Sequence, residues 1–297
     1  MSLHHRNGTL ASGNDPVLLT AAQAGWAYSG LQVVALVPGE PRTIPTDQCE
    51  VIVLPLSAEN VVATVGDETF HLDGRTSVFA RVSDFLYVGR QSTVELVAAE
   101  GGEVAVASAR AETARPARYG PTSGIGIEVR GAGQATRQIS NFASPERWEH
   151  ADRIMCVEVY TPDGNWSSYP PHKHDDSPEC EVNNEEIYYF RIGHAGTTEY
   201  SPQGFGMHRT YTDDGAIDEN VAVTDGDVFL IPRGYHGPCI AAPGYDMYYL
   251  NVLAGPGGVR SMAFCDDPDH HWIRDEWEHM PTDVRCPMVT VEGRANG

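Results

Sequence analysis

The sequence has few of the features that mark membrane, secreted or nucleic-acid-binding proteins. No apolar run among its 297 residues approaches the roughly eighteen residues that a membrane-spanning helix needs. Residues 1–6 carry no apolar signal core. Basic residues are scarce, with 20 Lys and Arg against 41 Asp and Glu and a formal net charge of -21, which would repel nucleic acids and anionic membranes. We therefore expect a soluble cytoplasmic protein with neither as a partner.

Closely spaced cysteines are absent. No Cys-x-x-Cys occurs, and a chain of this length can bury enough apolar surface to fold without disulfides. We expect free thiols throughout, with Cys180 and Cys239 acting as small apolar residues rather than as thiolate ligands. The six cysteines are Cys49, Cys156, Cys180, Cys239, Cys265 and Cys286.

Amphipathic helical periodicity is scarce, with short candidates only at residues 20–25 and 275–279. Strand-like runs such as 31–37, 50–56 and 84–88 recur instead between turn residues. This pattern favours an all-β fold.

The length favours two domains, because 297 residues exceed the usual size of a single core. A looser stretch at 109–126 contains Pro116, Pro121 and several glycines, and it separates two strand-rich halves. We place the boundary there and predict an N-terminal domain of residues 1–125 and a C-terminal domain of residues 126–297.

The second half contains a set of side chains that can bind a metal. His172 and His174 are two residues apart, so on a β-strand they point to the same face. Glu186 begins a β-branched and aromatic run, and His236 follows a turn-rich segment at 225–235. Three neutral imidazoles and one carboxylate suit zinc, manganese, iron, cobalt or nickel, and they leave coordination positions open for a substrate.

These residues resemble the two motifs of the cupin family, in which His-x-His is followed by Glu and Gly, and a later Gly and Pro-x-Gly are followed by His. The resemblance implies a double-stranded β-helix, also called a jelly roll. Two spacings differ from the usual pattern: eleven residues separate His174 from Glu186, and one residue separates Gly234 from His236.

The long insert leaves more than one candidate for the acidic ligand. Glu179, Glu181 and Glu185 lie close enough in the sequence to compete with Glu186. Only Glu186 keeps the spacing to Gly193 that the cupin pattern has. We therefore assign the metal ligands as His172, His174, Glu186 and His236.

The first half has no His-x-His pair, and its only histidine beyond the terminus is His71. A single strand histidine is usually structural. We therefore expect two tandem cupin domains, a degenerate N-terminal one without metal and a C-terminal one that holds one divalent ion. Zinc, manganese and iron are the candidates.

Longer strings resemble one group of cupins, the 5-deoxy-glucuronate isomerases of bacterial inositol catabolism. They run through almost the whole chain, which makes the resemblance specific. The strings include Gly74-Arg75, Asp84 to Val88, Arg130-Gly131-Ala132-Gly133 with Thr136-Arg137, Gly164 to Asp175, Tyr211 to Asp214, Pro232 to His236 and Gly244 to Val252.

The resemblance implies a metal-dependent aldose–ketose isomerase that converts 5-deoxy-D-glucuronate to 5-dehydro-2-deoxy-D-gluconate through an enediolate, which the metal would stabilise. A base must shuttle the proton, and strand parity favours Tyr188, which shares a face with Glu186. We name Tyr188, Glu185 and Tyr248 as candidate catalytic residues. Tyr211, Asp213 and Asp246 remain alternatives.

The substrate of such an enzyme is a small sugar acid, whose carboxylate needs a fork of hydrogen-bond donors. Arg209 and Arg233 are the candidates for this role, with Tyr211 as a further substrate-binding residue. Lys173 points away from the face that His172 and His174 share.

Two other functions fit the same ligands. An iron-dependent cupin dioxygenase would use the open positions for oxygen, and a non-catalytic sugar-acid-binding cupin would use the metal only to order its ligand. A hexuronate ketol-isomerase shares the cupin core, but the string from Trp166 to Pro171 resembles the inositol group better. The oligomeric state stays open, although chains with two cupin domains often form homo-oligomers.

Overall fold

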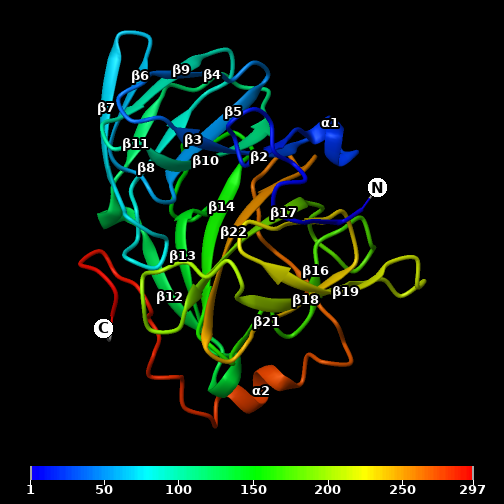
Figure 1. Ribbon diagram of the computed structural model, residues 1–297. Helices are drawn as coiled ribbons and strands as arrows, with labels where there is room; N and C mark the ends of the chain where they lie inside the picture. Colours follow the sequence, from blue (N-terminus) through cyan, green and yellow to red (C-terminus); the bar gives the residue numbers. More distant parts are fainter. Residues whose placement is uncertain (1, 296–297) are drawn as a thin grey trace.

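Antiparallel β-sheets form the framework of the molecule and helices are few and short, which confirms the predicted all-β fold class (Figure 1). The computed structural model describes residues 2–295; Met1, Asn296 and Gly297, at the ends of the two predicted domains, lie outside the described residues. No helix of the described chain is long and apolar enough to span a membrane. Its helical segments are α1 (Ala21–Ala24), α2 (Ile273–Trp277) and the 3-10 turns η1 (Thr122–Gly124) and η2 (Gly133–Ala135).

The first unit is a sandwich of two sheets formed by strands between residues 17 and 120. Val34 and Val53 pack in the core between these sheets, whereas their neighbours Val33 and Ile52 pack toward the second unit, as strand alternation requires. The larger sheet has the order β11 (Arg118–Gly120), β8 (Phe85–Val88), β5 (Cys49–Pro55), β10 (Gly102–Arg110), β3 (Ser29–Leu36) and β2 (Val17–Leu19). The smaller sheet has the order β4 (Arg42–Pro45), β9 (Thr93–Ala98), β6 (Glu59–Val65) and β7 (Glu68–Gly74).

The second unit is also a sandwich, and it contains the predicted metal ligands. Its larger sheet has the order β1 (His4–His5), β20 (Val228–Ile231), β17 (Glu185–His194), β22 (Tyr245–Ala254), β14 (Met155–Thr161), β13 (Arg137–Ala143) and β12 (Gly126–Arg130). Its smaller sheet has the order β19 (Asp218–Thr224), β18 (Phe205–Tyr211), β21 (Tyr235–Ala241), β16 (His172–Lys173) and β23 (Cys265–Asp266), and β15 (Trp166–Ser167) also pairs with β21.

The two units share one apolar core. Strand β3 of the first unit contacts β17 and β22 of the second, and Figure 1 shows the blue and cyan strands of the first unit stacked above the green and yellow ones. One face of the large second sheet is therefore covered by the first unit, through residues such as Leu250 and Val252. Only the opposite face of that sheet, toward β16 and β21, remains available for a binding site.

One segment crosses the predicted boundary between residues 125 and 126. Strand β1, at the start of the chain, pairs with β20 of the second unit. His4 Nε2 lies 2.8 Å from a carboxylate oxygen of Asp227, and the backbone N–H of Asn7 donates to the other oxygen at 2.8 Å. The N-terminal segment therefore covers the edge of the sheet that carries Glu186.

The prediction that all cysteines are free thiols is wrong for Cys180 and Cys265, which form a disulfide with Cα atoms 5.6 Å apart. The remaining four are free. Strand β23 pairs with β16 next to the insert that follows His174. This pairing brings Cys265 close to Cys180, which is 85 positions away in the sequence. Because the contact is long-range, no local spacing pattern could have indicated it.

Candidate active site

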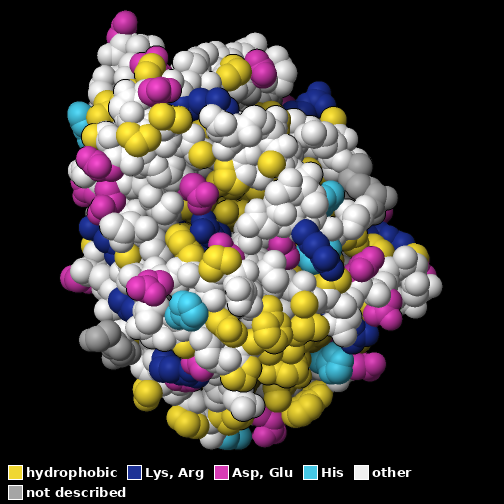
Figure 2. Space-filling view, viewed as in Figure 1, with side chains coloured by type: hydrophobic (Ala, Val, Ile, Leu, Met, Phe, Trp, Pro, Cys, Tyr) yellow, Lys and Arg dark blue, Asp and Glu magenta, His cyan; other side chains and the backbone are white. Residues whose placement is uncertain are grey.

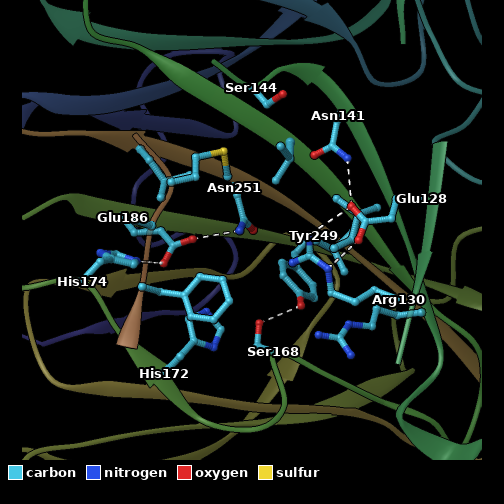
Figure 3. Close-up of a pocket in the computed structure, with 18 of the residues that line it drawn as sticks. Glu128, Arg130, Asn141, Ser144, Ser168, His172, His174, Glu186, Tyr249 and Asn251 are labelled. Carbon is cyan, nitrogen blue, oxygen red and sulfur yellow. Dashed lines mark hydrogen bonds and ion pairs between the residues drawn. The ribbon is translucent and has the colours of Figure 1, made fainter. Parts of the chain in front are cut away.

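A pocket of about 580 Å³ lies between the two sheets of the second unit. Its floor consists of side chains from β12, β13, β14, β17 and β22, and its other wall includes Ser168, His172 and residues 261–264. Figure 3 shows a histidine–glutamate cluster at one end and Arg130 with Glu128 at the other. The pocket is thus polar at both ends.

The structure brings three of the four predicted metal ligands, His174, Glu186 and His236, within ligand distance of one another, and it places the fourth, His172, beside His236. Glu186 Oε2 lies 2.9 Å from His174 Nε2 and 3.0 Å from His236 Nε2. His172 and His236 are direct cross-strand partners on β16 and β21, and their ring centroids are 4.4 Å apart. Strand parity explains why these side chains share one face.

Hydrogen bonds at the far side of the ligand cluster orient its members. The carbonyl oxygens of Asn184 and Pro170 accept from Nδ1 of His174 and of His172 at 3.1 and 3.2 Å. Metal-binding imidazoles commonly hold their second ring nitrogen in this way. Asn251 Nδ2 donates to Glu186 Oε1 at 2.8 Å and fixes the carboxylate.

The charges of the cluster favour a bound cation. Burial, followed by the charge of His236, lowers the pKa of His172 well below its usual value, which keeps that imidazole neutral. Burial alone would raise the pKa of Glu186, but the charge of His236 and the hydrogen bond from His174 outweigh it and hold the pKa well below its usual range. The site therefore combines an ionised carboxylate with the neutral imidazole of His172.

His236 provides the test of whether these residues fit a metal. It is 1% exposed, and neither ring nitrogen has a hydrogen-bond partner, because Nε2 approaches Glu186 without hydrogen-bond geometry. A buried polar atom without a partner is costly, and a cation beside it would remove that cost. Ligand atoms of His174, Glu186 and His236 lie within 4.8 Å of one another, and the donor set suits a divalent transition metal.

A row of hydroxyl groups runs along the pocket from the cluster. Ser168 Oγ lies 3.0 Å from the hydroxyl of Tyr188 and 2.9 Å from that of Tyr249. Burial raises the pKa of both phenols well above the usual value, so both keep their protons at neutral pH. Ser168 has a φ of 44°, and a Cβ on Gly237 would lie 1.8 Å from its carbonyl oxygen, so only glycine fits after His236.

Arginines form the other end of the pocket. Arg130 binds Glu128 with both ends of its fork, with Nε–Oε1 and Nη2–Oε2 distances of 2.8 and 3.0 Å. Arg137 is 4% exposed, and its Nη1 donates to the carbonyl oxygen of Ala135 at 3.0 Å. Its guanidinium lies over the ring of Trp277 from α2, 5.5 Å from the centroid.

Two predicted catalytic residues lie outside the pocket. Glu185 accepts hydrogen bonds from the backbone N–H groups of residues 27–29 at 2.7 to 2.8 Å, so it anchors the first unit. Tyr248 donates to Glu158 Oε1 at 2.8 Å on the sheet face that the first unit covers. Both residues directly precede pocket residues, Glu186 and Tyr249, and alternation therefore turns them to the opposite face. Tyr188 is the one predicted catalytic residue that lines the pocket.

The predicted substrate-binding residues do not line the pocket either. Arg209 and Arg233 are about half exposed, and they lie 3.5 and 3.2 Å from Asp218 and Asp214. The Tyr211 hydroxyl donates to Asp267 instead. Arg209 and Tyr211 lie on β18 of the smaller sheet and Arg233 in the turn before β21. Residue type alone does not tell which strand residues face the pocket.

Several pocket residues were not predicted as site residues. Ser168, Tyr249, Asn251, Arg130 and Arg137 line the pocket. All five fall within the strings that resemble the isomerase group. Tyr249 and Asn251 also alternate along one strand, which is a signal for a shared face.

Comparisons with known proteins agree with this structure. Residues 3–273 match the KduI/IolB family. The 5-deoxy-glucuronate isomerase of Geobacillus kaustophilus is 41% identical over 263 residues, which cover 87% of this chain and 90% of that one. The 5-deoxy-glucuronate isomerase of Bacillus subtilis strain 168 is 36% identical over 258 residues, with coverages of 86% and 91%.

Solved structures show the same architecture. An IolB-like protein from Salmonella typhimurium superimposes with a TM-score of 0.82 at 34% identity, covering 92% of this chain and 100% of that one. An oxalate decarboxylase from Lactobacillus farciminis superimposes with a TM-score of 0.65 at 12% identity, covering 95% and 97%. The likeness to the decarboxylase concerns the fold alone, and it confirms the predicted tandem cupin architecture.

Proposed function

Because the chain belongs to the KduI/IolB family and is an isomerase, we propose that it converts 5-deoxy-D-glucuronate to 5-dehydro-2-deoxy-D-gluconate in inositol catabolism. The reaction moves a carbonyl group to the neighbouring carbon without net oxidation. The support for the substrate comes from relatives that carry the name 5-deoxy-glucuronate isomerase and match almost the whole chain.

We propose further that the reaction depends on one divalent ion. The observation that supports this is the convergence of His172, His174, Glu186 and His236 at one end of the pocket, with both ring nitrogens of buried His236 unpartnered. Zinc, manganese and iron suit these donors. Bound there, such an ion supplies a Lewis acid that polarises the substrate carbonyl and acidifies the hydrogen on the adjacent carbon.

Tyr188 is the side chain that we propose for proton transfer. Its hydroxyl is buried in the pocket and held by Ser168 at 3.0 Å. Because burial raises its pKa well above the usual value, it donates a hydrogen bond or a proton to a substrate oxygen as negative charge develops there. The carbon-bound proton needs a separate acceptor, and Glu128 and Glu146 are the pocket carboxylates besides Glu186.

A substrate panel tests the proposed reaction. Metal-loaded protein is incubated with 5-deoxy-D-glucuronate, D-glucuronate and D-galacturonate, and ketose formation is measured for each. Fastest turnover of the 5-deoxy compound supports the proposal. Faster turnover of a hexuronate would instead assign the chain to hexuronate metabolism, and oxygen consumption without ketose formation would indicate a dioxygenase.

A further inference from the structure

We propose that Arg137 forms a carboxylate-binding subsite, at the end of the pocket opposite the histidine–glutamate cluster, which selects acidic over neutral sugars. The inference rests on the proposed function, because it assigns the recognition of the substrate's carboxylate within that same pocket. In this role Arg137 replaces Arg209 and Arg233, which the sequence suggested and which are about half exposed outside the pocket.

The first support is that Arg137 is a buried cation without an anionic partner. Three arginines of the described chain are buried, namely Arg75, Arg137 and Arg191. Arg75 pairs with Glu158 at 2.5 Å, and Arg191 pairs with Glu103 at 2.7 Å and with Asp225 at 2.8 Å. Arg137 has no carboxylate within ion-pair distance among residues 2–295. Proteins rarely bury a charge unless it is paired, so a partner from outside the chain is expected.

The second support is the orientation of the guanidinium. Nη1 is held by the carbonyl oxygen of Ala135 at 3.0 Å, whereas Nε and Nη2 have no acceptor within the part of the chain that the structure describes. These two groups form the edge of the fork that binds a carboxylate in a bidentate manner. Because Arg137 lines the pocket, an anion in the pocket can reach them.

The backbone around Arg137 is shaped for this orientation. Gly131 has a φ of 79°, and a Cβ there would lie 2.2 Å from the Ala135 carbonyl oxygen and 2.7 Å from Arg137 Nη1. Any side chain at this position would therefore displace the guanidinium or its acceptor. Trp277 covers the other side, 5.5 Å from the guanidinium carbon, so the donors are fixed before a ligand arrives.

The electrostatics of this end of the pocket favour an anion. Burial lowers the pKa of Arg137, and the charges of Arg130 and Arg274 lower it further, to about 10, although Tyr249 and Glu128 act in the opposite direction. The guanidinium is therefore still charged at neutral pH. The nearby carboxylate of Glu128 is already bound by Arg130. Arg274 is likewise bound to Asp266 at 2.5 Å, so the charge that stays unpaired among these three arginines is that of Arg137.

The position of Arg137 matches the shape of the substrate. A uronic acid carries its aldehyde and its carboxylate at opposite ends of one carbon chain. In the pocket, Tyr249 is close enough to Arg137 to influence its pKa, and its hydroxyl connects through Ser168 to Tyr188 beside His236. Figure 3 shows Tyr249 and Arg130 across the pocket from His174 and Glu186. A sugar acid bound to Arg137 would thus extend along the hydroxyl row toward the cluster.

The test is the variant Arg137→Met, which keeps the length of the side chain and removes its charge. D-Gluconate, an acid without an aldehyde, serves as a probe that binds without turnover, and D-glucitol is its neutral counterpart. We expect Arg137→Met to raise the Kd for gluconate and the KM for 5-deoxy-D-glucuronate by roughly 10- to 100-fold, as the loss of a charge-assisted hydrogen-bond pair implies. Its kcat should change much less, and the weaker binding of glucitol should not change.

The matched control is Arg209→Met, which removes an arginine charge outside the pocket. The guanidinium of Arg209 is about half exposed and lies 3.5 Å from Asp218, so we expect its removal to change the gluconate Kd by less than about fivefold. Arg137→Lys should recover only part of the affinity, because an ammonium group lacks the fork.

Thermal unfolding distinguishes a binding role from a structural one. If Arg137 is kept for ligand binding, removing its unpaired buried charge should leave the Tm unchanged or raise it. If Arg137 mainly stabilised the fold, Arg137→Met would lower the Tm, and this result would contradict the subsite.

The outcomes separate the subsite from the proposed reaction. Wild-type affinity for gluconate in Arg137→Met, or no gluconate binding by the wild type, would overturn the subsite even if the isomerase reaction occurs. Gluconate binding that Arg137→Met abolishes, in a protein that does not isomerise 5-deoxy-D-glucuronate, would support the subsite and overturn the proposed reaction.

Discussion

Arg75 of the first unit and Glu158 of the second form an ion pair at 2.5 Å in which both side chains are fully buried. The Tyr160 hydroxyl accepts from Arg75 Nη1 at 3.0 Å, and Tyr248 donates to Glu158 at 2.8 Å. Glu158 lies on β14 between Val157 and Val159, which line the pocket on the opposite face. The first unit therefore supports the back of the active-site sheet.

Removing one member of this pair should destabilise the whole chain. Arg75→Met leaves Glu158 buried without its cation, so we expect a loss of about 3–5 kcal/mol in the free energy of unfolding, measured with urea. The double variant Arg75→Met with Glu158→Leu should recover most of that loss, since no charge remains buried. A single variant that costs less than about 1 kcal/mol would contradict the structural role of the pair.

The metal ligands can be tested without an activity measurement. His174→Ala and His236→Ala should each lose bound metal, measured by elemental analysis after gel filtration, while the circular dichroism spectrum stays that of a β protein. The control is His71→Ala on the exposed part of β7, which should keep wild-type metal content. Metal retained by both ligand variants would refute the assignment.

Tyr188→Phe should lower kcat by about 100-fold or more, as expected for the loss of a proton-transferring group. Its KM and metal content should change little, because the phenol is held by Ser168 and is not one of the ligands. Tyr248→Phe makes the same chemical change on the opposite face of the sheet. That control should keep its kcat but lose stability, since Glu158 loses a hydrogen bond. Equal kcat losses in both variants would argue against a role of Tyr188 in the chemistry.

Activity should fall as the pH drops below about 6, near the ordinary pKa of imidazole. Burial lowers the pKa of His174, but the hydrogen bond and charge of Glu186 outweigh it and raise the pKa overall. Protons therefore compete more effectively for this nitrogen as the pH falls, and metal is released. Glu186 does not titrate in this range, because its pKa is held well below the usual value. A flat profile of activity between pH 5 and 8 would contradict metal dependence.

The sequence could predict which site residues share one face of a strand. His172 and His174 share a face because they are two residues apart, and Glu186 and Tyr188 follow the same rule; the structure places all four at the pocket. The same rule excludes Glu185, which adjoins Glu186, and its selection as a catalytic residue ignored that alternation.

The sequence could not predict which segments far apart in the chain come into contact. Arg137 and Arg209 are both strand arginines, and only the packing of β13 under α2 buries the first while the second stays exposed. The Cys180–Cys265 disulfide and the pairing of β1 with β20 likewise join segments that lie far apart in the chain. Surface charge gave no indication of the site, because acidic side chains are dispersed over the face shown in Figure 2 and are not gathered in one patch.

The most direct measurement follows 5-deoxy-D-glucuronate by proton NMR in heavy water, with metal-loaded and chelator-treated protein side by side. We predict loss of the aldehyde signal only with the metal-loaded protein. The ketose product should carry deuterium at the carbon that was the aldehyde of the substrate, as an enediol route requires. Equal turnover by the chelator-treated protein would contradict the metal dependence, and no turnover by either sample would contradict the isomerase function.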